Sequence, residues 1–398
     1  MDFDLNPEQA LLQDNVERLL REHYAFDQRQ RHLALAQGWS RQMWSQYAAL
    51  GLLALPFDEA HGGAGLGAVE SMIVMESFGR WLTLEPYLAT VVLGGAALRL
   101  AGSAAQQAAI LPAVCSGARL LALAHMEPDA RYAWHQVCSR ARRVAGGWRL
   151  DGEKTLVLHG DCADTLIVAA RVAGETDDRS GVALFLVDAQ AAGVHRRGYA
   201  LQNDTRAADI RFDAVTVPAT ALLDSPDDGL PVLERVLDEG IAAICAAGVG
   251  ALERMHTTTI DYLRTRQQFG VPIGSFQALQ HRAVDMLVAL EQARSMSYLA
   301  TMMVAAPALE RRKAVSAAKA QFCQSARAIG KDAVQLHGGI GVTLECQVAH
   351  YFKHTTTLEF LFGDFEHHIA QLAAAGGFTA AREAQEDRRD APHPHATA

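Results

Sequence analysis

Two stretches of the sequence carry residue types that suit a phosphate-containing ligand. They span residues 264–277 and 335–341. In the first, the guanidinium of Arg266 presents a fork of donors that matches a phosphate or pyrophosphate, and Phe269 offers an aromatic face. In the second, Gly338 and Gly339 allow backbone N–H groups to approach a ligand closely. Each stretch by itself is better explained as the end of a helix, with Gly270 as a C-cap or the glycine pair as a helix breaker.

Histidine pairs are further candidates for chemistry. His350 and His354 are four residues apart, a spacing that can bind a metal on a helix, but no acidic third ligand is near. We therefore expect no metal site. His367 and His368 are adjacent, so on a helix they point apart, and we expect them at the surface or against a partner.

The elements that hold these residues follow the order helical, β, helical. Asn6-Pro7-Glu8-Gln9 combines a capping residue, a first-turn proline and a glutamine three residues after the cap, which predicts the start of a helix. The glycine-rich residues 62–67 lack a preceding strand and a following Lys-Ser/Thr, so we interpret them as a loop between helices. Asp151-Gly152 predicts the turn of a β-hairpin.

Three further segments are rich in β-formers and are bounded by Gly, Asp or Pro: Thr165–Val172, Val182–Val187 and Asp209–Val217. From Pro231 on, the pattern is helical again. The sequence therefore predicts a mostly helical protein with a central β-domain. Its expected parts are a helical domain (residues 1–119), a β-domain (120–223), a linker (224–229), a helical bundle (230–380) and a disordered tail (381–398).

Composition excludes several classes of protein. Half of the residues are apolar and a fifth are charged, which is typical of a globular chain and not of a disordered scaffold. The formal net charge is −9, so we expect no nucleic-acid partner. The longest strongly apolar stretch, residues 241–252, is shorter than the ~20 residues of a membrane span. Six scattered cysteines and an acidic N-terminus favour a reduced, cytoplasmic protein.

Taken together, the two phosphate-suited stretches resemble the RxxFG…Q and QxxGGxG motifs of the acyl-CoA dehydrogenase flavoproteins. The resemblance extends over nearly the whole chain, because Leu55-Pro56, Glu127-Pro128 and the segments 151–154 and 213–218 follow in the family's order. It implies an N-terminal helical domain, a middle β-barrel-like domain and a C-terminal four-helix bundle. It also implies FAD as cofactor, oxidation of an acyl-CoA thioester to the 2,3-enoyl-CoA, and electron-transfer flavoprotein as acceptor.

Family sites are built from two subunits, and the resemblance covers only one of the two contributions. The residues that hold the adenosine diphosphate end of FAD in a neighbouring subunit are kept: Arg266, Phe269, Gln277, Gln335, Gly338 and Gly339. The flavin-ring residues are largely lost. Residues 126–133 read Met-Glu-Pro-Asp-Ala-Arg-Tyr-Ala where the family has Thr-Glu-Pro-Gly-Ala-Gly-Ser-Asp, and residues 156–159 read Leu-Val-Leu-His in place of Trp-Ile-Thr-Asn.

The catalytic glutamate of the family is absent from both of its usual positions. These positions hold Phe362 and Gly240, and neither side chain can accept a proton. Glu239 is the candidate replacement, but a neighbour on a helix is turned by ~100°, so it needs a rotated or bulged helix to act as the base. Asp238 and Asp364 are the other nearby carboxylates, and Asp238 and Glu239 are better explained as ordinary charged residues on a partly exposed turn.

We therefore expect a subunit that lacks the base and works in a hetero-oligomer, such as an α2β2 complex, with a second subunit that carries the catalytic glutamate. The alternatives are a self-sufficient homo-oligomer that uses Glu239 and a non-enzymatic scaffold that binds no flavin. Segments 85–95 and 280–286 are similar to small subunits of dehydrogenases for pimeloyl-CoA, which implies a dicarboxylyl-CoA substrate. Arg131 is a candidate cation for its free carboxylate.

Overall fold

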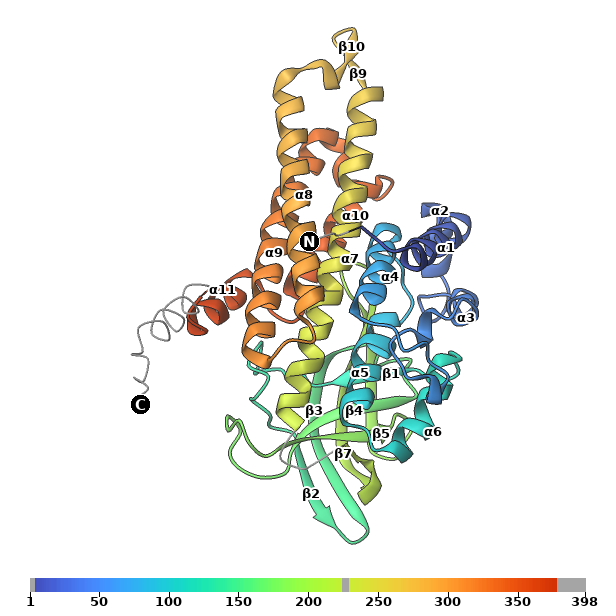
Figure 1. Cartoon of the computed structure of the whole chain (residues 1–398), viewed down its shortest axis with the longest axis vertical. Coiled ribbons are helices and arrows are strands. Elements are labelled where there is room, and N and C mark those ends of the chain that lie inside the picture. Colours follow the sequence, from blue (N-terminus) through green and yellow to red (C-terminus); the bar gives the residue numbers. More distant parts are fainter. Residues whose placement is uncertain (1–3, 224–228, 378–398) are drawn as a thin grey trace, which may run out of the picture.

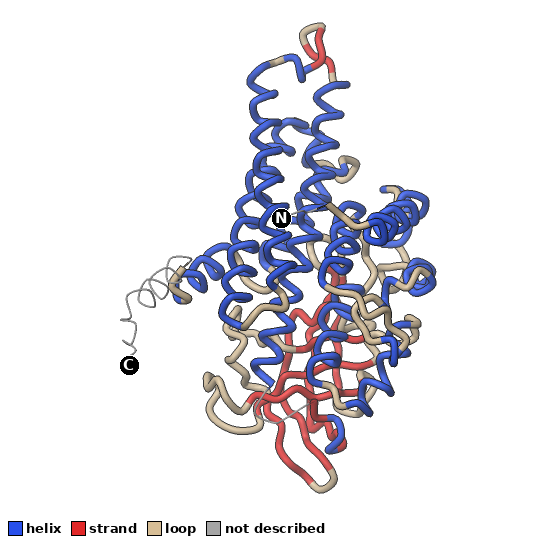
Figure 2. Tube along the Cα trace, viewed as in Figure 1, coloured by secondary structure: helices blue, strands red, loops and turns tan. Residues whose placement is uncertain are grey.

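The computed structural model describes residues 4–223 and 229–377, and the predicted order of helical, β and helical parts is confirmed (Figures 1 and 2). The long bundle runs along the molecular axis, the sheet lies at its lower end, and the N-terminal helices pack along one side. The predicted tail (381–398) and most of the predicted linker (224–228) lie outside the described residues. Within the described residues, no helix is long and apolar enough to cross a membrane.

The N-terminal part consists of short helices: α1 (Pro7–His23), α2 (Phe26–Leu33), α3 (Arg41–Ala49), η1 (Leu52–Ala54), η2 (Glu59–His61), α4 (Ala68–Trp81), η3 (Leu88–Gly95), α5 (Ala96–Ala101) and α6 (Ala104–Cys115). Asn6 and Gln9 cap α1 reciprocally, as predicted. Residues 62–67 form the predicted loop before α4. The segment η3 is a π-helix, a rare form that is common at functional sites, and it leads directly into α5.

The middle part is one eight-stranded sheet in the order β6-β7-β3-β2-β4-β5-β8, with β1 added beside β4. Its strands are β1 (Leu121–Ala124), β2 (Arg140–Val144), β3 (Gly147–Leu158), β4 (Thr165–Arg171), β5 (Val182–Asp188), β6 (Val194–Ala200), β7 (Arg206–Pro218) and β8 (Leu222–Leu223). Strands β1 and β2 pair with β4 in parallel, and the other pairs are antiparallel. One sheet face encloses a core of its own, and the other joins the main core of the molecule.

The predicted hairpin turn at Asp151-Gly152 is wrong. Strand β3 continues through both residues, and the turn between β2 and β3 lies at residues 145–146, with Gly146 at φ +83°. Gly152 instead lies at a register shift between β3 and β7, where an ideal Cβ would be 2.3 Å from Ser139 Oγ. The glycine is needed for this close approach within a bulge and not for a tight turn.

The C-terminal part is a bundle around α7 (Gly229–Thr265), which packs on α8 (Gln277–Met303), α9 (Ala308–His337) and α10 (Gln347–Phe360). A short 3-10 turn, η6 (Gly338–Val342), follows α9, and α11 (Phe365–Ala374) follows α10. The predicted continuous helical pattern is interrupted between α7 and α8. Residues 266–276 form a projecting hairpin of β9 (Gln267–Gln268) and β10 (Val271–Pro272) followed by η5 (Ile273–Ser275), and we call this segment the finger (Figure 1).

Candidate functional site

The two usual base positions, far apart in the sequence, meet in space. Gly240 lies on α7 and Phe362 lies just after α10. A Cβ built on Gly240 would be 2.7 Å from Leu93 Cδ2 and 3.4 Å from Phe362 Cε2. Phe362 is buried, with 2% of its surface exposed. The place between these two positions is therefore filled by the Leu93 and Phe362 side chains, and we call this arrangement the packed centre.

The loop that carries Phe362 is held firmly by buried polar groups. Lys319 Nζ donates to the carbonyl oxygens of Glu359 and Gly363, each at 2.7 Å. A ring nitrogen of His368 lies 3.2 Å from the Phe362 carbonyl oxygen. Burial lowers the pKa of both Lys319 and His368. Phe362 itself has φ +59°, a conformation that a bulky residue adopts only where its surroundings enforce it.

The role expected for His368 at the surface is wrong. Its side chain is buried, and its Nδ1 lies 3.2 Å from Ser316 Oγ, so both ring nitrogens have partners. His367 is half-buried, and its ring lies near the Tyr132 ring at an angle of 55°. The adjacent histidines do point in different directions, but α11 packs on α9, and this contact buries one of the two.

One histidine, at the end of strand β1, lies near the packed centre. The His125 ring lies 6.2 Å from the Phe362 ring, centroid to centroid, and neither of its nitrogens has a hydrogen-bond partner among the described residues. Burial, and secondarily the Lys154 ammonium, lowers the pKa of His125 to about 3. His125 is thus neutral near pH 7. The sequence signal for it was a polar residue directly after the apolar strand β1.

Glu127 and Lys154 form a buried ion pair beside this centre, with 2.6 Å between Oε1 and Nζ. The carboxylate also accepts from the backbone N–H groups of Cys138 and Ser139. Burial by itself raises the pKa of Glu127, but Lys154 and these donors outweigh burial and hold the pKa below its usual value. Every partner is internal to the β-domain, so this pair fixes the strand ends and leaves no free base.

Arg131 and Tyr132 stand where the family has glycine and serine, and together with Trp134 they bring bulky side chains to the groove between sheet and bundle. The Tyr132 ring lies 5.2 Å from the His367 ring, and the Arg312 guanidinium lies 5.0 Å from the Trp134 ring centre. Arg131, the candidate partner of a substrate carboxylate, lines this open groove with φ +43°. Arg131 lines neither the pocket that contains Glu239 nor the pocket that is lined by His159 and Leu361.

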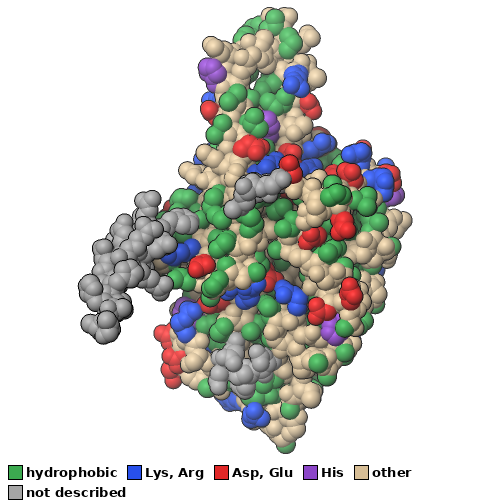
Figure 3. Space-filling model, in the orientation of Figure 1, with side chains coloured by type: hydrophobic (Ala, Val, Ile, Leu, Met, Phe, Trp, Pro, Cys, Tyr) green, Lys and Arg blue, Asp and Glu red, His purple; other side chains and the backbone are tan. Residues whose placement is uncertain are grey.

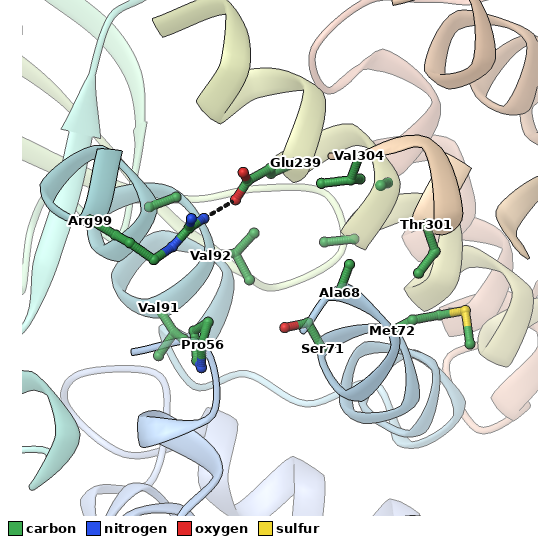
Figure 4. A pocket seen from close by; sticks show the side chains of 13 residues that line it. Pro56, Ala68, Ser71, Met72, Val91, Val92, Arg99, Glu239, Thr301 and Val304 are labelled. Carbon is green, nitrogen blue, oxygen red and sulfur yellow. Dashed lines mark hydrogen bonds and ion pairs between the residues drawn. The ribbon is translucent and has the colours of Figure 1, made fainter. Parts of the chain in front are cut away.

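Glu239 faces away from the packed centre. Its carboxylate is 2.6 Å from Arg99 and 3.0 Å from Arg235, and it lines a different pocket, between α4, α5, α7 and α8 (Figure 4). Helix α7 is regular here, without the bulge that a base role for Glu239 needs. Asp238 is also occupied, because it pairs with Arg311 and Arg312 at 2.9 and 2.8 Å.

The phosphate-suited residues lie at the opposite end of the bundle. The Tyr262 ring stacks on the His337 ring with centroids 4.5 Å apart, and this contact brings the base of the finger next to the Gly338-Gly339 turn. Neither motif indicated this link. Arg266 and Gln277 are exposed at the finger, and Gln335 is exposed on the last turn of α9.

Two features of this end point outward. Phe269 is 91% exposed at the tip of the finger, with φ +54°. Gly338 has φ +65°, and no atom lies within 4 Å of a Cβ built on Gly338 or Gly339. The glycine turn is therefore an open cradle of backbone donors, and no described residue forms an ion pair with Arg266.

The finger and the packed centre cannot serve one and the same ligand within this chain. Helix α7 runs unbroken from Gly240 to Thr265, and at 1.5 Å per residue this separates the centre from the finger by about 38 Å. A single FAD molecule does not span this distance. The donors at the finger are therefore available to a neighbouring chain.

The histidine pair at the metal-binding spacing is used elsewhere. His354 Nδ1 lies 3.2 Å from Asn203 Nδ2, and His350 Nε2 lies 2.9 Å from the Leu344 carbonyl oxygen. Both contacts tie α10 to neighbouring segments. Within the described residues, no group of three or more His, Cys, Asp or Glu side chains is arranged to hold a metal.

Comparison with known proteins covers nearly the whole chain. Models of the N-terminal, middle and C-terminal domains of acyl-CoA dehydrogenases match residues 6–118, 122–215 and 227–377. The chain is 31% identical to acyl-CoA dehydrogenase FadE27 of Mycobacterium tuberculosis, over 83% of this chain and 86% of that one. It is 28% identical to benzylmalonyl-CoA dehydrogenase of Aromatoleum aromaticum, over 89% and 93%. Among solved structures, a chain of the ChsE4–ChsE5 complex of M. tuberculosis superimposes with a TM-score of 0.84 at 27% identity, over 99% and 100%.

Proposed function

The chain belongs to the acyl-CoA dehydrogenase family of FAD-dependent oxidoreductases, and we propose that it acts as the base-lacking subunit of a hetero-oligomer, where it completes the flavin site of a second family member. One observation carries the proposal. The donor residues are intact, exposed and about 38 Å from a centre that Leu93 and Phe362 fill. A homo-oligomer of such chains has donors but no complete reaction centre.

The fit of FAD differs between the two ends of the molecule. At the finger, Arg266 can pair with the pyrophosphate, Phe269 can cover a ring, and the Gly338-Gly339 turn can donate backbone N–H groups. In the flavin-ring segments, Leu156 and Leu158 stand where the family has tryptophan and threonine, and Phe362 stands at a usual position of the base. The chain therefore fits the adenosine diphosphate end of FAD and not its ring.

In this arrangement, the residues of this chain orient the cofactor and the partner performs the proton transfer. With FAD bound, the complex would have an acceptor for the hydride that leaves the β-carbon of an acyl-CoA thioester when the 2,3-enoyl-CoA forms. The α-proton needs a carboxylate on the other side of the substrate. This chain has none at its own centre, since Glu239 is paired with two arginines in a separate pocket.

For the complex, we propose a thioester with a free carboxylate, such as pimeloyl-CoA, as substrate and electron-transfer flavoprotein as electron acceptor. Support for the substrate comes from the similarity to a relative named for benzylmalonyl-CoA, which also carries a free carboxylate. Turnover of pimeloyl-CoA against octanoyl-CoA by the complex tests the substrate class. Preference for octanoyl-CoA would contradict it.

The half-site is tested by co-expression with a second family member that carries the catalytic glutamate. We expect the chain alone to be colourless and inactive, and the complex to be yellow and active. Arg266→Ala should remove FAD from the complex, because the pyrophosphate loses its bidentate cation. Arg264→Ala is the matched control, since Arg264 is also exposed, two residues earlier on α7.

Equal FAD content in the Arg266→Ala and Arg264→Ala complexes would contradict the half-site. A chain that is yellow and active alone would instead support the self-sufficient homo-oligomer. A chain that is colourless both alone and with its partner would support the scaffold. FAD content and turnover are measured on the same preparations. Gel filtration of these preparations distinguishes loss of FAD from loss of the complex itself.

A further inference from the structure

The pocket that contains Glu239 has an apolar wall and a charged end. It lies between α4, η3, α5, α7 and α8 and holds about 510 Å³ of empty space, its mouth included. Valine, alanine and methionine side chains form most of its wall, and the Arg99–Glu239 ion pair closes one end (Figure 4). Gly240, the next residue on α7, faces the packed centre instead. The pocket is therefore separate from the place where family members react.

A second pocket continues this space. It has about 560 Å³ of empty space, its opening to solvent included, and shares Met72 and Thr301 with the first pocket. Leu5 and Met302 extend its apolar lining toward the N-terminus of α1. The two pockets adjoin at Met72 and Thr301, and a methionine side chain adapts readily to a ligand. We call the two adjoining pockets the groove between α4 and α8.

The charged end of the groove has an excess of positive charge. Arg99 and Arg235 share the single carboxylate of Glu239, which accepts hydrogen bonds from Nη2 of Arg99 and Nε of Arg235. Each guanidinium has five N–H donors, so most donors remain available at this end. An anionic group is thus attracted to the arginine end of the groove.

We propose that this groove binds a free, unbranched carboxylic acid. Its carboxylate contacts Arg99 beside Glu239, and its alkyl chain follows the apolar wall past Met72 into the second pocket. The group that the arginine end recognises is the carboxylate itself, which the methyl ester of the same acid lacks. The site serves binding alone, since no carboxylate, thiol or hydroxyl of the packed centre reaches it.

Calorimetry with octanoate on the purified full-length chain tests the proposal. We expect saturable binding of one octanoate per chain and at least tenfold weaker binding of methyl octanoate. Arg99→Gln should weaken octanoate binding about tenfold, which corresponds to about 1.4 kcal/mol. Glu239→Gln should strengthen it severalfold, because the competing carboxylate is removed. Arg21→Gln, on the exposed face of α1, is the matched charge control and should bind as the wild type does.

The position of the ligand is read on the unaltered chain. In protein labelled with ¹³C-methyl methionine, the Met72 signal, assigned with Met72→Leu, should shift on addition of octanoate. In Ala242→Leu the larger side chain fills the pocket, so both the shift of the Met72 signal and the heat of octanoate binding should disappear. Equal affinity for octanoate and its methyl ester, unchanged affinity in Arg99→Gln, or an unmoved Met72 signal would each overturn the proposal.

Discussion

Adding a methyl group at Gly240 tests whether the reaction centre of this chain is packed shut. The added Cβ meets Leu93 Cδ2 at 2.7 Å, so Leu93 has to move. Overpacking of this kind costs about 1–3 kcal/mol. Replacing a helical glycine by alanine contributes about 1 kcal/mol in the opposite direction. We therefore expect Gly240→Ala to destabilise the chain by about 0–2 kcal/mol.

The effect of Gly240→Ala on the free energy of unfolding should change sign once the contact with Leu93 is removed. Leu93→Ala itself costs about 2–5 kcal/mol, because a buried leucine leaves a cavity. In that background, Gly240→Ala no longer clashes, and the helix gain of about 1 kcal/mol remains. The coupling free energy between the two sites is then about 1–3 kcal/mol. Leu98→Ala, which removes another buried leucine from the same stretch of helix, serves as the control background.

Urea unfolding followed by circular dichroism measures these free energies. Gly240→Ala should lower the midpoint in the wild type and in Leu98→Ala, and raise it in Leu93→Ala. If Gly240→Ala has the same effect in all three backgrounds, with coupling below about 0.5 kcal/mol, Leu93 does not fill the centre and the reasoning is refuted.

Two other substitutions separate the proposed roles. Glu239→Gln should leave turnover by the complex unchanged, since the carboxylate pairs with Arg99 and Arg235 away from the centre; loss of turnover with retained FAD would identify it as the base. Burial lowers the pKa of His125 to about 3, whereas the pKa in the unfolded chain is ~6.5. The folded chain therefore keeps its full stability above pH ~6.5 and loses stability as the pH falls below this value, by about 2 kcal/mol at pH 5. In His125→Leu the fall in melting temperature between pH 7 and pH 5 should be smaller, and an unchanged fall would contradict the buried neutral ring.

Local patterns in the sequence predicted most of the fold, because they depend on neighbours along the chain. The Asn6–Gln9 cap and the strands from Thr165 and Val182 are set by hydrogen bonds and alternation within a few residues. The turn prediction at Asp151-Gly152 was wrong because it, too, used only neighbours along the chain. The dipeptide suits a turn, but pairing of β3 with β7 on one side and contact with Ser139 on the other made it a bulge.

His368 was misplaced for a related reason. Its position next to His367 says only that the two side chains diverge. Which of them is buried depends on the packing of α11 against α9, and that contact joins segments about fifty residues apart. Sequence spacing carries no information about such a choice.

The sequence by itself determined which chemical groups this protein has. It has an intact set of phosphate-suited residues around Arg266, and phenylalanine and glycine where a base is expected. Only the tertiary structure decided what these groups can reach. It brought Phe362 to Gly240 and filled the space with Leu93, it turned Glu239 toward Arg99, and it placed the finger at the far end of α7. The physical reason is that residue identity fixes charge and donors, whereas distance and burial are set by packing between segments remote in the chain.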